Sequence, residues 1–260
     1  MADMPSGSEQ QQVKELRAVG LVKRYGGLVA LDRLTLSVLP GQVHALLGPN
    51  GSGKTTALNV LSLAEMPTEG QVLLGGMTVT GAGRAAAASM GIARTHQSPL
   101  FFSELSVAEH CMLVGTWNSS GSAVRWLAGG PTVRMARTSL REILDALGLW
   151  KVRDIRAALL AYPQLKRLEV AAALSMSPTV LLLDEPASGS GPDELLSVCE
   201  VVSRARDAGV GIVVVDHALP FIERVADVVT VLDSGHVIAS GGLDVLEYAH
   251  VRAALCGVRT

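Results

Sequence analysis

The chain has 260 residues, of which 48% are hydrophobic and only 3% aromatic, and its formal net charge is −2. This length lies at the upper end for one compact domain, which can bury roughly 70–75% of its unfolded surface. A net charge near zero argues against a general nucleic-acid-binding protein, because phosphate neutralisation needs a basic field. Three widely spaced cysteines favour a reducing compartment, and no apolar run approaches the ~18 residues that a membrane span needs.

The first part of the chain is predicted to be a tail followed by strands. Residues 1–12 are polar, which is unlike a signal peptide and predicts a disordered tail before a domain over residues 13–260. Strands are expected between residues 16 and 38, because 33–38 alternates with period two before a Pro-Gly pair ends it. The pattern then predicts a buried strand at 43–47, a helix over 57–61 and an exposed strand with a tight turn at 70–76.

Further along, a helical section precedes alternating strands and helices. Helical patterns extend from about residue 107 to 177, with breaks at 118–121 and 129–131. A strand at 180–183, a helix at 194–207 and a strand at 211–215 follow. This alternation predicts an α/β fold with a parallel sheet, in which phosphate chemistry takes place at the carboxyl ends of the strands.

The most informative motif is a glycine-rich loop between the strand at 43–47 and the helix after it. Residues 48–55 fit G-x-x-x-x-G-K-[ST], and a Lys-Thr pair at the helix start disfavours an ordinary turn. Lys54 is expected to reach the β- and γ-phosphates of a nucleoside triphosphate, and the Thr55 hydroxyl to hold Mg²⁺. The expected nucleotide-binding residues are Gly48, Pro49, Asn50, Gly51, Ser52, Gly53, Lys54, Thr55 and Thr56.

Two carboxylates follow four apolar residues at the end of a predicted central strand. Asp184 is expected to hold Mg²⁺ opposite Thr55, and Glu185 to polarise the attacking water. A strand that ends in a polar turn is the alternative, but it is disfavoured here because a complete phosphate-binding loop precedes it. The sequence therefore predicts nucleotide hydrolysis rather than binding alone.

Two further polar residues are expected at strand tips. Gln97 ends a predicted strand at 92–97, and its amide can touch both Mg²⁺ and the water. His217 follows the apolar residues of another strand and is expected to donate to the γ-phosphate. Each residue alone is most simply a satisfied polar group; together with the two motifs they predict one catalytic constellation.

The motifs together resemble the ATP-binding subunit of an ATP-binding-cassette (ABC) transporter over about residues 14–257. The closest resemblance is to the ATP-binding subunit of bacterial branched-chain amino-acid importers. Four stretches carry this resemblance. Residues 25–31, with Tyr25, are similar to the adenine-stacking loop, and residues 91–97 are similar to the Gln loop, in which Phe is usual at the position of His96. Residues 160–164 are similar to the signature motif, and the insert at 113–131 also fits the family.

This resemblance implies a P-loop NTPase cassette of three parts. These are a RecA-like core with a parallel sheet, an antiparallel β subdomain, and a helical subdomain inserted at about residues 101–175. It also implies two subunits that dimerise head to tail around two ATP molecules and dock on transmembrane permease subunits. The signature of each chain then contacts the partner's nucleotide; here its residues are Leu160, Ala161, Tyr162, Pro163 and Gln164.

The residues that depart from the family pattern lie where a family member contacts the nucleotide of its partner subunit. Pro163 replaces a glycine, which removes an N–H donor and fixes φ. Gly191 replaces an amide or carboxylate in the loop after Glu185. These changes favour an asymmetric heterodimer over a homodimer, with family drift as the alternative.

The expected function is an ATPase subunit at the cytoplasmic face of the inner membrane, peripheral through its permease. It powers import of branched-chain amino acids or a related small solute, delivered by a solute-binding protein. The alternatives are a weak or non-hydrolysing partner subunit, or an ATPase for another solute such as urea or amides. A cassette of DNA repair or translation is disfavoured, because neither a long coiled coil nor a second cassette is present. Four of the nine aromatic residues follow Gln97 (Phe101, Phe102, Trp117 and Trp126). By the resemblance they are expected either to meet the permease or to fill the core of the helical subdomain.

Overall fold

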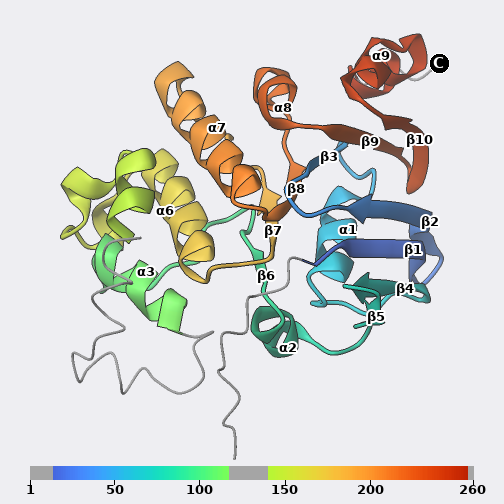
Figure 1. Ribbon diagram of the computed structural model, residues 1–260. Coiled ribbons are helices and arrows are strands. Elements are labelled where there is room, and N and C mark those ends of the chain that lie inside the picture. Colours follow the sequence, from blue (N-terminus) through green and yellow to red (C-terminus); the bar gives the residue numbers. More distant parts are fainter. Residues whose placement is uncertain (1–13, 117–139, 257–260) are drawn as a thin grey trace, which may run out of the picture.

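The computed structural model describes residues 14–116 and 140–256, which form two sheets flanked by helices (Figure 1). The expected tail at 1–12, the residues of the insert from 117 onward, and both Trp117 and Trp126 lie outside this described part. Within it, no helix combines the length and apolar character that crossing a membrane requires.

The smaller sheet is antiparallel, with the order β2-β1-β4-β5. Its strands are β1 (Leu16–Tyr25), β2 (Leu28–Val38), β4 (Glu69–Leu74) and β5 (Met77–Thr78). The strands expected at 16–38 are therefore confirmed. The strand expected as exposed at 70–76 is half-buried instead, because Val72 and Leu74 face the core beneath this sheet.

The larger sheet has the order β10-β9-β3-β8-β7-β6, and all its pairings are parallel except that of the edge strand β10. Its strands are β3 (Val43–Leu47), β6 (Ile92–Arg94), β7 (Val180–Asp184), β8 (Gly211–Val215), β9 (Val228–Asp233) and β10 (His236–Gly241). β3, β7 and β8 are buried along their whole length, which explains their continuous apolar sequences. The predicted parallel sheet is confirmed.

Helices cover both faces of the larger sheet. Alternate residues of β7 show this clearly: Leu182 packs on the side of α1 and the antiparallel sheet, whereas Leu181 and Leu183 pack on the side of α7 and α8. The helices are α1 (Lys54–Leu61), α2 (Arg84–Ser89), α3 (Val107–Thr116), α6 (Tyr162–Ser175), α7 (Pro192–Asp207), α8 (Leu219–Val225) and α9 (Ala249–Leu255), with short 3₁₀ turns at Trp150–Val152, Ala157–Leu159 and Leu243–Glu247.

The predicted helical section includes α3, residues 140–146 and α6, which lie together beyond the β6 edge (Figure 1). α6 and α1 stand on opposite sides of β6 and β7 in this view. β6 ends at Arg94, so Gln97 lies in a loop rather than at the end of a strand. The strand ends early because side chains of α6, not another strand, bind the backbone of residues 96 and 97.

Candidate functional site

The phosphate-binding loop connects β3 to α1 and depends on glycine at two positions. Gly48 has φ 147°, and a Cβ there would lie 2.1 Å from the Leu232 carbonyl oxygen. Gly53 has φ 107°, and its Cβ would lie 2.4 Å from the Ala30 carbonyl oxygen. At these two positions the loop is therefore pressed against neighbouring backbone, which leaves no room for a side chain. Its shape brings backbone N–H groups to the start of α1, where an anion is favoured.

Lys54 is folded back over this loop. Its Nζ donates to the carbonyl oxygens of Gly48 and Pro49, each at 2.8 Å. Burial lowers the pKa of Lys54, whereas the negative charges of Glu185 and Asp184 act in the opposite direction. The charge of the lysine is thus close to both carboxylates, and loop carbonyls hold it where phosphate oxygens can replace them.

Asp184 ends β7 and is only 3% exposed. Its Oδ2 lies 3.3 Å from Arg94 Nη2, and its backbone N–H donates to Thr95 Oγ1 at 2.9 Å. Burial raises the pKa of Asp184, while the neighbouring Arg94 lowers it. A carboxylate here, with the exposed hydroxyl-bearing Thr55 in the first turn of α1, is the hard-oxygen chemistry that Mg²⁺ prefers.

Glu185 gathers the other predicted catalytic residues. Its Oε1 accepts a hydrogen bond from Gln97 Nε2 at 3.4 Å and lies 3.5 Å from His217 Nε2. The residue has φ 51°, and its N–H donates to the Val215 carbonyl at 2.7 Å, which ties the turn to β8. The side chain of His217 is half-exposed, so this corner is open to solvent. The structure thus brings together three residues that are distant in the sequence.

Asp216 organises the two loops around Glu185 and was not predicted. Its Oδ2 accepts the N–H of Ala187 and its Oδ1 accepts the N–H of Ala218, both at 2.9 Å. Burial raises the pKa of Asp216, although these backbone donors oppose the shift. The carboxylate therefore joins the loop after Glu185 to the loop after His217. Its position directly before His217, at the end of an apolar strand, is the feature of the sequence that could have predicted a role for Asp216 in the site.

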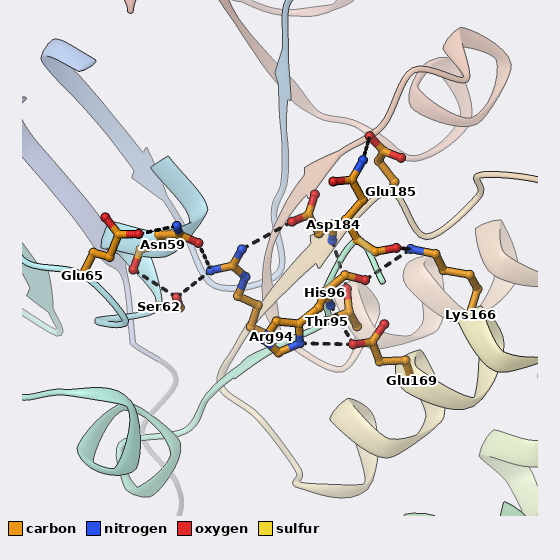
Figure 2. A network of polar contacts seen from close by, with 11 residues as sticks. Asn59, Ser62, Glu65, Arg94, Thr95, His96, Lys166, Glu169, Asp184 and Glu185 are labelled. Atoms are coloured by element: carbon orange, nitrogen blue, oxygen red, sulfur yellow. Dashed lines mark hydrogen bonds and ion pairs between the residues drawn. The ribbon is translucent and has the colours of Figure 1, made fainter. Parts of the chain in front are cut away.

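Side chains of α6 hold the backbone of the Gln97 loop (Figure 2). Lys166, which is 2% exposed, donates to the carbonyl oxygens of His96 and Gln97. Glu169 accepts the His96 N–H at 2.7 Å, and the Tyr162 hydroxyl donates to the Gln97 carbonyl at 3.3 Å. The helix that begins at the signature therefore fixes the backbone of a predicted catalytic residue.

Tyr25 is held at the other end of the site. Its hydroxyl donates to Glu65, and Lys23 Nζ lies 5.0 Å from the ring centroid. Burial, followed by the hydrogen bond to Glu65, raises the pKa of the Tyr25 phenol, while a hydrogen bond with Thr56 lowers it. The ring is therefore anchored beside the phosphate-binding loop, and it remains 45% exposed. An anchored, exposed aromatic ring suits the stacking of a nucleobase.

The signature residues lead into α6, which begins at Tyr162. Leu160 is buried, Ala161 is the N-cap, and Pro163 occupies the first turn, where the helix needs no N–H. The Ala161 N–H donates to Gln164 Oε1 at 3.0 Å. β6 and β7 stand between this helix and α1 (Figure 1), so the structure does not bring the signature onto the chain's own phosphate-binding loop.

Comparisons with known proteins identify the family of the chain. The family model described as ABC transporter matches residues 31–188. The high-affinity branched-chain amino-acid transport ATP-binding protein LivG of Escherichia coli K12 is 31% identical over 85% of this chain and 89% of its own length. BraF of Pseudomonas aeruginosa, with the corresponding description, is 30% identical over 87% and 91%. The ribose import ATP-binding protein RbsA 1 of Rubrobacter xylanophilus is 34% identical over 86% of this chain but 44% of its own length.

Solved structures show the same fold. A nucleotide-free ATP-binding cassette of an ABC transporter superposes with a TM-score of 0.78 at 29% identity, covering 92% of this chain and 97% of that one. The ADP conformation of another such cassette gives a TM-score of 0.79 at 28% identity, with 94% and 99% covered. These findings confirm the predicted family and fold class. The chain belongs to the ABC transporter family and is an ATP-binding subunit, a member of the ATPases that are coupled to transport.

Proposed function

We propose that this subunit hydrolyses ATP with Glu185 as the residue that polarises the attacking water. The observation that carries the proposal is the convergence of Gln97 and His217 on one oxygen of Glu185. A carboxylate that is oriented by an amide and an imidazole at an open corner is suited to hold a water in line with the γ-phosphate. His217 donates to the γ-phosphate, and Lys54 exchanges its loop carbonyls for phosphate oxygens.

Mg²⁺ would be held by Thr55 and Asp184, with Gln97 as a further ligand. Hydroxyl, carboxylate and amide oxygens fit this ion, which keeps several waters and takes few protein ligands. The described residues contain no cluster of three His, Cys, Asp or Glu side chains that would hold a metal without the nucleotide. When bound, the ion neutralises charge on the phosphates. Tyr25 stacks on the base.

The second part of the proposal is an asymmetric dimer with another ATP-binding subunit. A proline in the first turn of α6 is harmless to the helix, but it removes an N–H that a glycine would offer to a partner's nucleotide. Gly191, the N-cap of α7, supplies no side chain to the partner; its N–H donates within the chain, to Glu194 Oε2 at 3.0 Å. The site served by this chain's signature is therefore the weaker one, and the loss of one preorganised donor costs about 10²–10³ in rate.

The solute is proposed to be a branched-chain amino acid or a related small molecule. LivG and BraF, whose own names refer to branched-chain amino acids, match this chain over nearly their whole length. The ribose importers match over less than half of theirs. Urea and amides are the other solutes that the proposal allows.

The surface proposed to meet a permease lies between α3 and α6. A cavity of about 360 Å³ is lined there by residues that include Leu100, Phe101, His110 and Glu169. Phe101 is 37% exposed and Phe102 is 54% exposed, so neither fills the core of the helical subdomain. Docking there would place the subunit at the cytoplasmic face of the inner membrane, peripheral through the permease.

The test is ATP hydrolysis by the purified chain as a function of its concentration, with Glu185→Gln as the control and ATP binding measured in parallel. Glu185→Gln keeps the size of the side chain and removes its charge, so it is expected to bind ATP without turnover. Wild-type protein that binds ATP but turns over only with a second subunit supports the heterodimer. A rate per molecule that rises with concentration contradicts asymmetry and leaves the ATPase intact. Turnover that survives Glu185→Gln would overturn the assigned role.

A further inference from the structure

A chain of polar side chains joins the two ends of the nucleotide site. It begins at Tyr25, whose hydroxyl donates to Glu65. From Glu65 onward it can be followed in Figure 2: Glu65 Oε1 accepts from Asn59 Nδ2 at 2.6 Å, and Asn59 Oδ1 accepts from Arg94 Nη1 at 2.7 Å. Arg94 Nη2 donates to Asp184 Oδ2 at 3.3 Å. Successive side-chain contacts therefore connect the proposed base platform with the proposed metal ligand.

Arg94 is the residue on which this chain of contacts depends. Its side chain is 10% exposed and that of Asp184 is 4% exposed, so the ion pair is buried. Arg94 Nη1 also donates to Ser62 Oγ at 3.1 Å, directly after α1. The backbone of Arg94 pairs with Leu182 of β7 in the larger sheet. Its guanidinium extends from this edge strand to α1, the helix of the phosphate-binding loop. Hydrogen bonds from both terminal nitrogens of the guanidinium therefore hold this side chain between α1 and β7.

This position affects how Asp184 is presented. Asp184 precedes Glu185, so two carboxylates and the phosphates of a nucleotide would share one corner of the site, and a fixed positive charge offsets part of their repulsion. Within the described chain, the contacts of the Asp184 carboxylate engage Oδ2 and leave Oδ1 for a ligand. A planar guanidinium can serve Asn59 and Asp184 with different nitrogens, which the point charge of a lysine cannot do.

We propose that Arg94 is a positioning residue, which orients Asp184 towards Mg²⁺ and is itself held by Asn59. The inference rests on the proposed function, because it takes Asp184 to be the residue that faces Mg²⁺ at an ATP site. The competing interpretation is a buried ion pair that serves stability alone. The two differ in one observable: only a positioning residue changes the benefit that nucleotide binding gains from Mg²⁺.

The experiment measures the dissociation constant of a fluorescent ATP analogue, N-methylanthraniloyl-ATP, with Mg²⁺ and with EDTA. The constant in EDTA divided by the constant in Mg²⁺ reports the benefit that binding gains from Mg²⁺, without requiring turnover. Arg94→Lys and Asn59→Ala are each expected to reduce this ratio about 10-fold, as for partners that orient a metal ligand. Arg204→Gln, which removes an exposed ion pair with Glu200 at 2.5 Å on α7, is the matched control and keeps the wild-type ratio.

The outcomes separate this inference from the function on which it rests. A wild-type ratio in both Arg94→Lys and Asn59→Ala, with folding verified by circular dichroism, overturns the positioning role and leaves the ATP site standing. A wild-type chain that gains nothing from Mg²⁺ overturns the proposed metal site and the inference together. If Arg94→Lys does not fold, Asn59→Ala tests the positioning role on its own, because it retains the buried ion pair of Arg94 with Asp184.

Discussion

Glu169 Oε1 accepts the backbone N–H of His96 at 2.7 Å, so the helix that begins at the signature holds the residue directly before Gln97. The same carboxylate lies 3.2 Å from His96 Nδ1. In the assembled transporter proposed above, the start of α6 faces the partner's nucleotide, whereas Gln97 faces the chain's own. One short helix therefore contributes to both sites, which makes its contacts with the Gln97 loop a place where the sites can influence each other.

We expect Glu169→Leu to lower the ATP turnover number about 10-fold with little change in ATP affinity, because the Gln97 loop loses its anchor but the phosphate-binding loop is untouched. The partly buried His96 N–H also loses its acceptor, which costs at most about 1–3 kcal/mol of stability. Glu169→Gln is the matched variant, since its amide oxygen still accepts the N–H. Steady-state kinetics and equilibrium binding of ATP measure the two effects. Equal turnover in the Leu and Gln variants would contradict the anchoring role.

The phosphate-binding loop provides a second prediction, from two glycines with similar φ. A Cβ on Gly53 would lie 2.4 Å from the backbone oxygen of Ala30, whereas a Cβ on Gly51 has nothing within 4 Å. Both have positive φ, 107° and 80°. Gly51→Ala is therefore expected to cost about 1–2 kcal/mol from backbone strain alone. Gly53→Ala should cost more, because the antiparallel sheet must shift; urea unfolding of both variants measures the difference, and equal losses would show that the clash relaxes freely.

The sequence alone predicted the parts of the fold that depend on a local pattern of residues. β3 and β8 have the predicted bounds, because buried central strands have continuous apolar sequences that end where the chain leaves the sheet. Gln97, Glu185 and His217 meet because parallel strands carry their carboxyl ends to one edge, which topology dictates once the strands are known. Their catalytic roles stay predictions.

The sequence alone did not predict contacts in which a side chain meets a residue that is distant in the sequence. Arg94 looks like any basic residue after a strand, and its partners Asn59 and Asp184 lie 35 and 90 positions away. Glu169 is one of several charged residues on α6, and no periodicity distinguishes it from a surface carboxylate. These contacts also moved the end of β6 three residues earlier than predicted. Side-chain pairing between distant segments depends on packing, which a single sequence does not contain.

Stability is expected to decrease at mildly acidic pH because of His44. Its Nε2 lies 2.8 Å from Thr230 Oγ1 and its Nδ1 lies 3.1 Å from the Ser37 carbonyl oxygen, and burial lowers the pKa of His44. Since the folded pKa lies below the unfolded value of about 6.5, the unfolded chain takes up a proton first. The contribution of neutral His44 to the free energy of unfolding is complete above about pH 6.5. It is lost as pH falls towards the folded pKa, by at most about 1.4 kcal/mol per pH unit.

Urea unfolding of the wild type and of His44→Gln between pH 7.5 and 5.5 tests this dependence. The difference between the two free energies of unfolding cancels the contributions of the other titrating groups. His250→Gln, at an exposed position in α9, is the matched control and is expected to keep the wild-type slope. A parallel slope for wild type and His44→Gln would exclude His44 as the source.

The start of α6 carries the sharpest test of the asymmetric dimer. Pro163→Gly restores an N–H and free backbone rotation at a position where the proline fits the first turn of the helix, so the fold should tolerate the change at a cost of about 1 kcal/mol. If the missing donor weakens the site that holds the partner's nucleotide, ATP turnover of the assembled complex rises with Pro163→Gly. Pro163→Ala separates the causes, because it restores the N–H without the freedom of glycine. Unchanged turnover in both variants would mean that the proline is tolerated at a working site, and the two sites would then be equivalent in this respect.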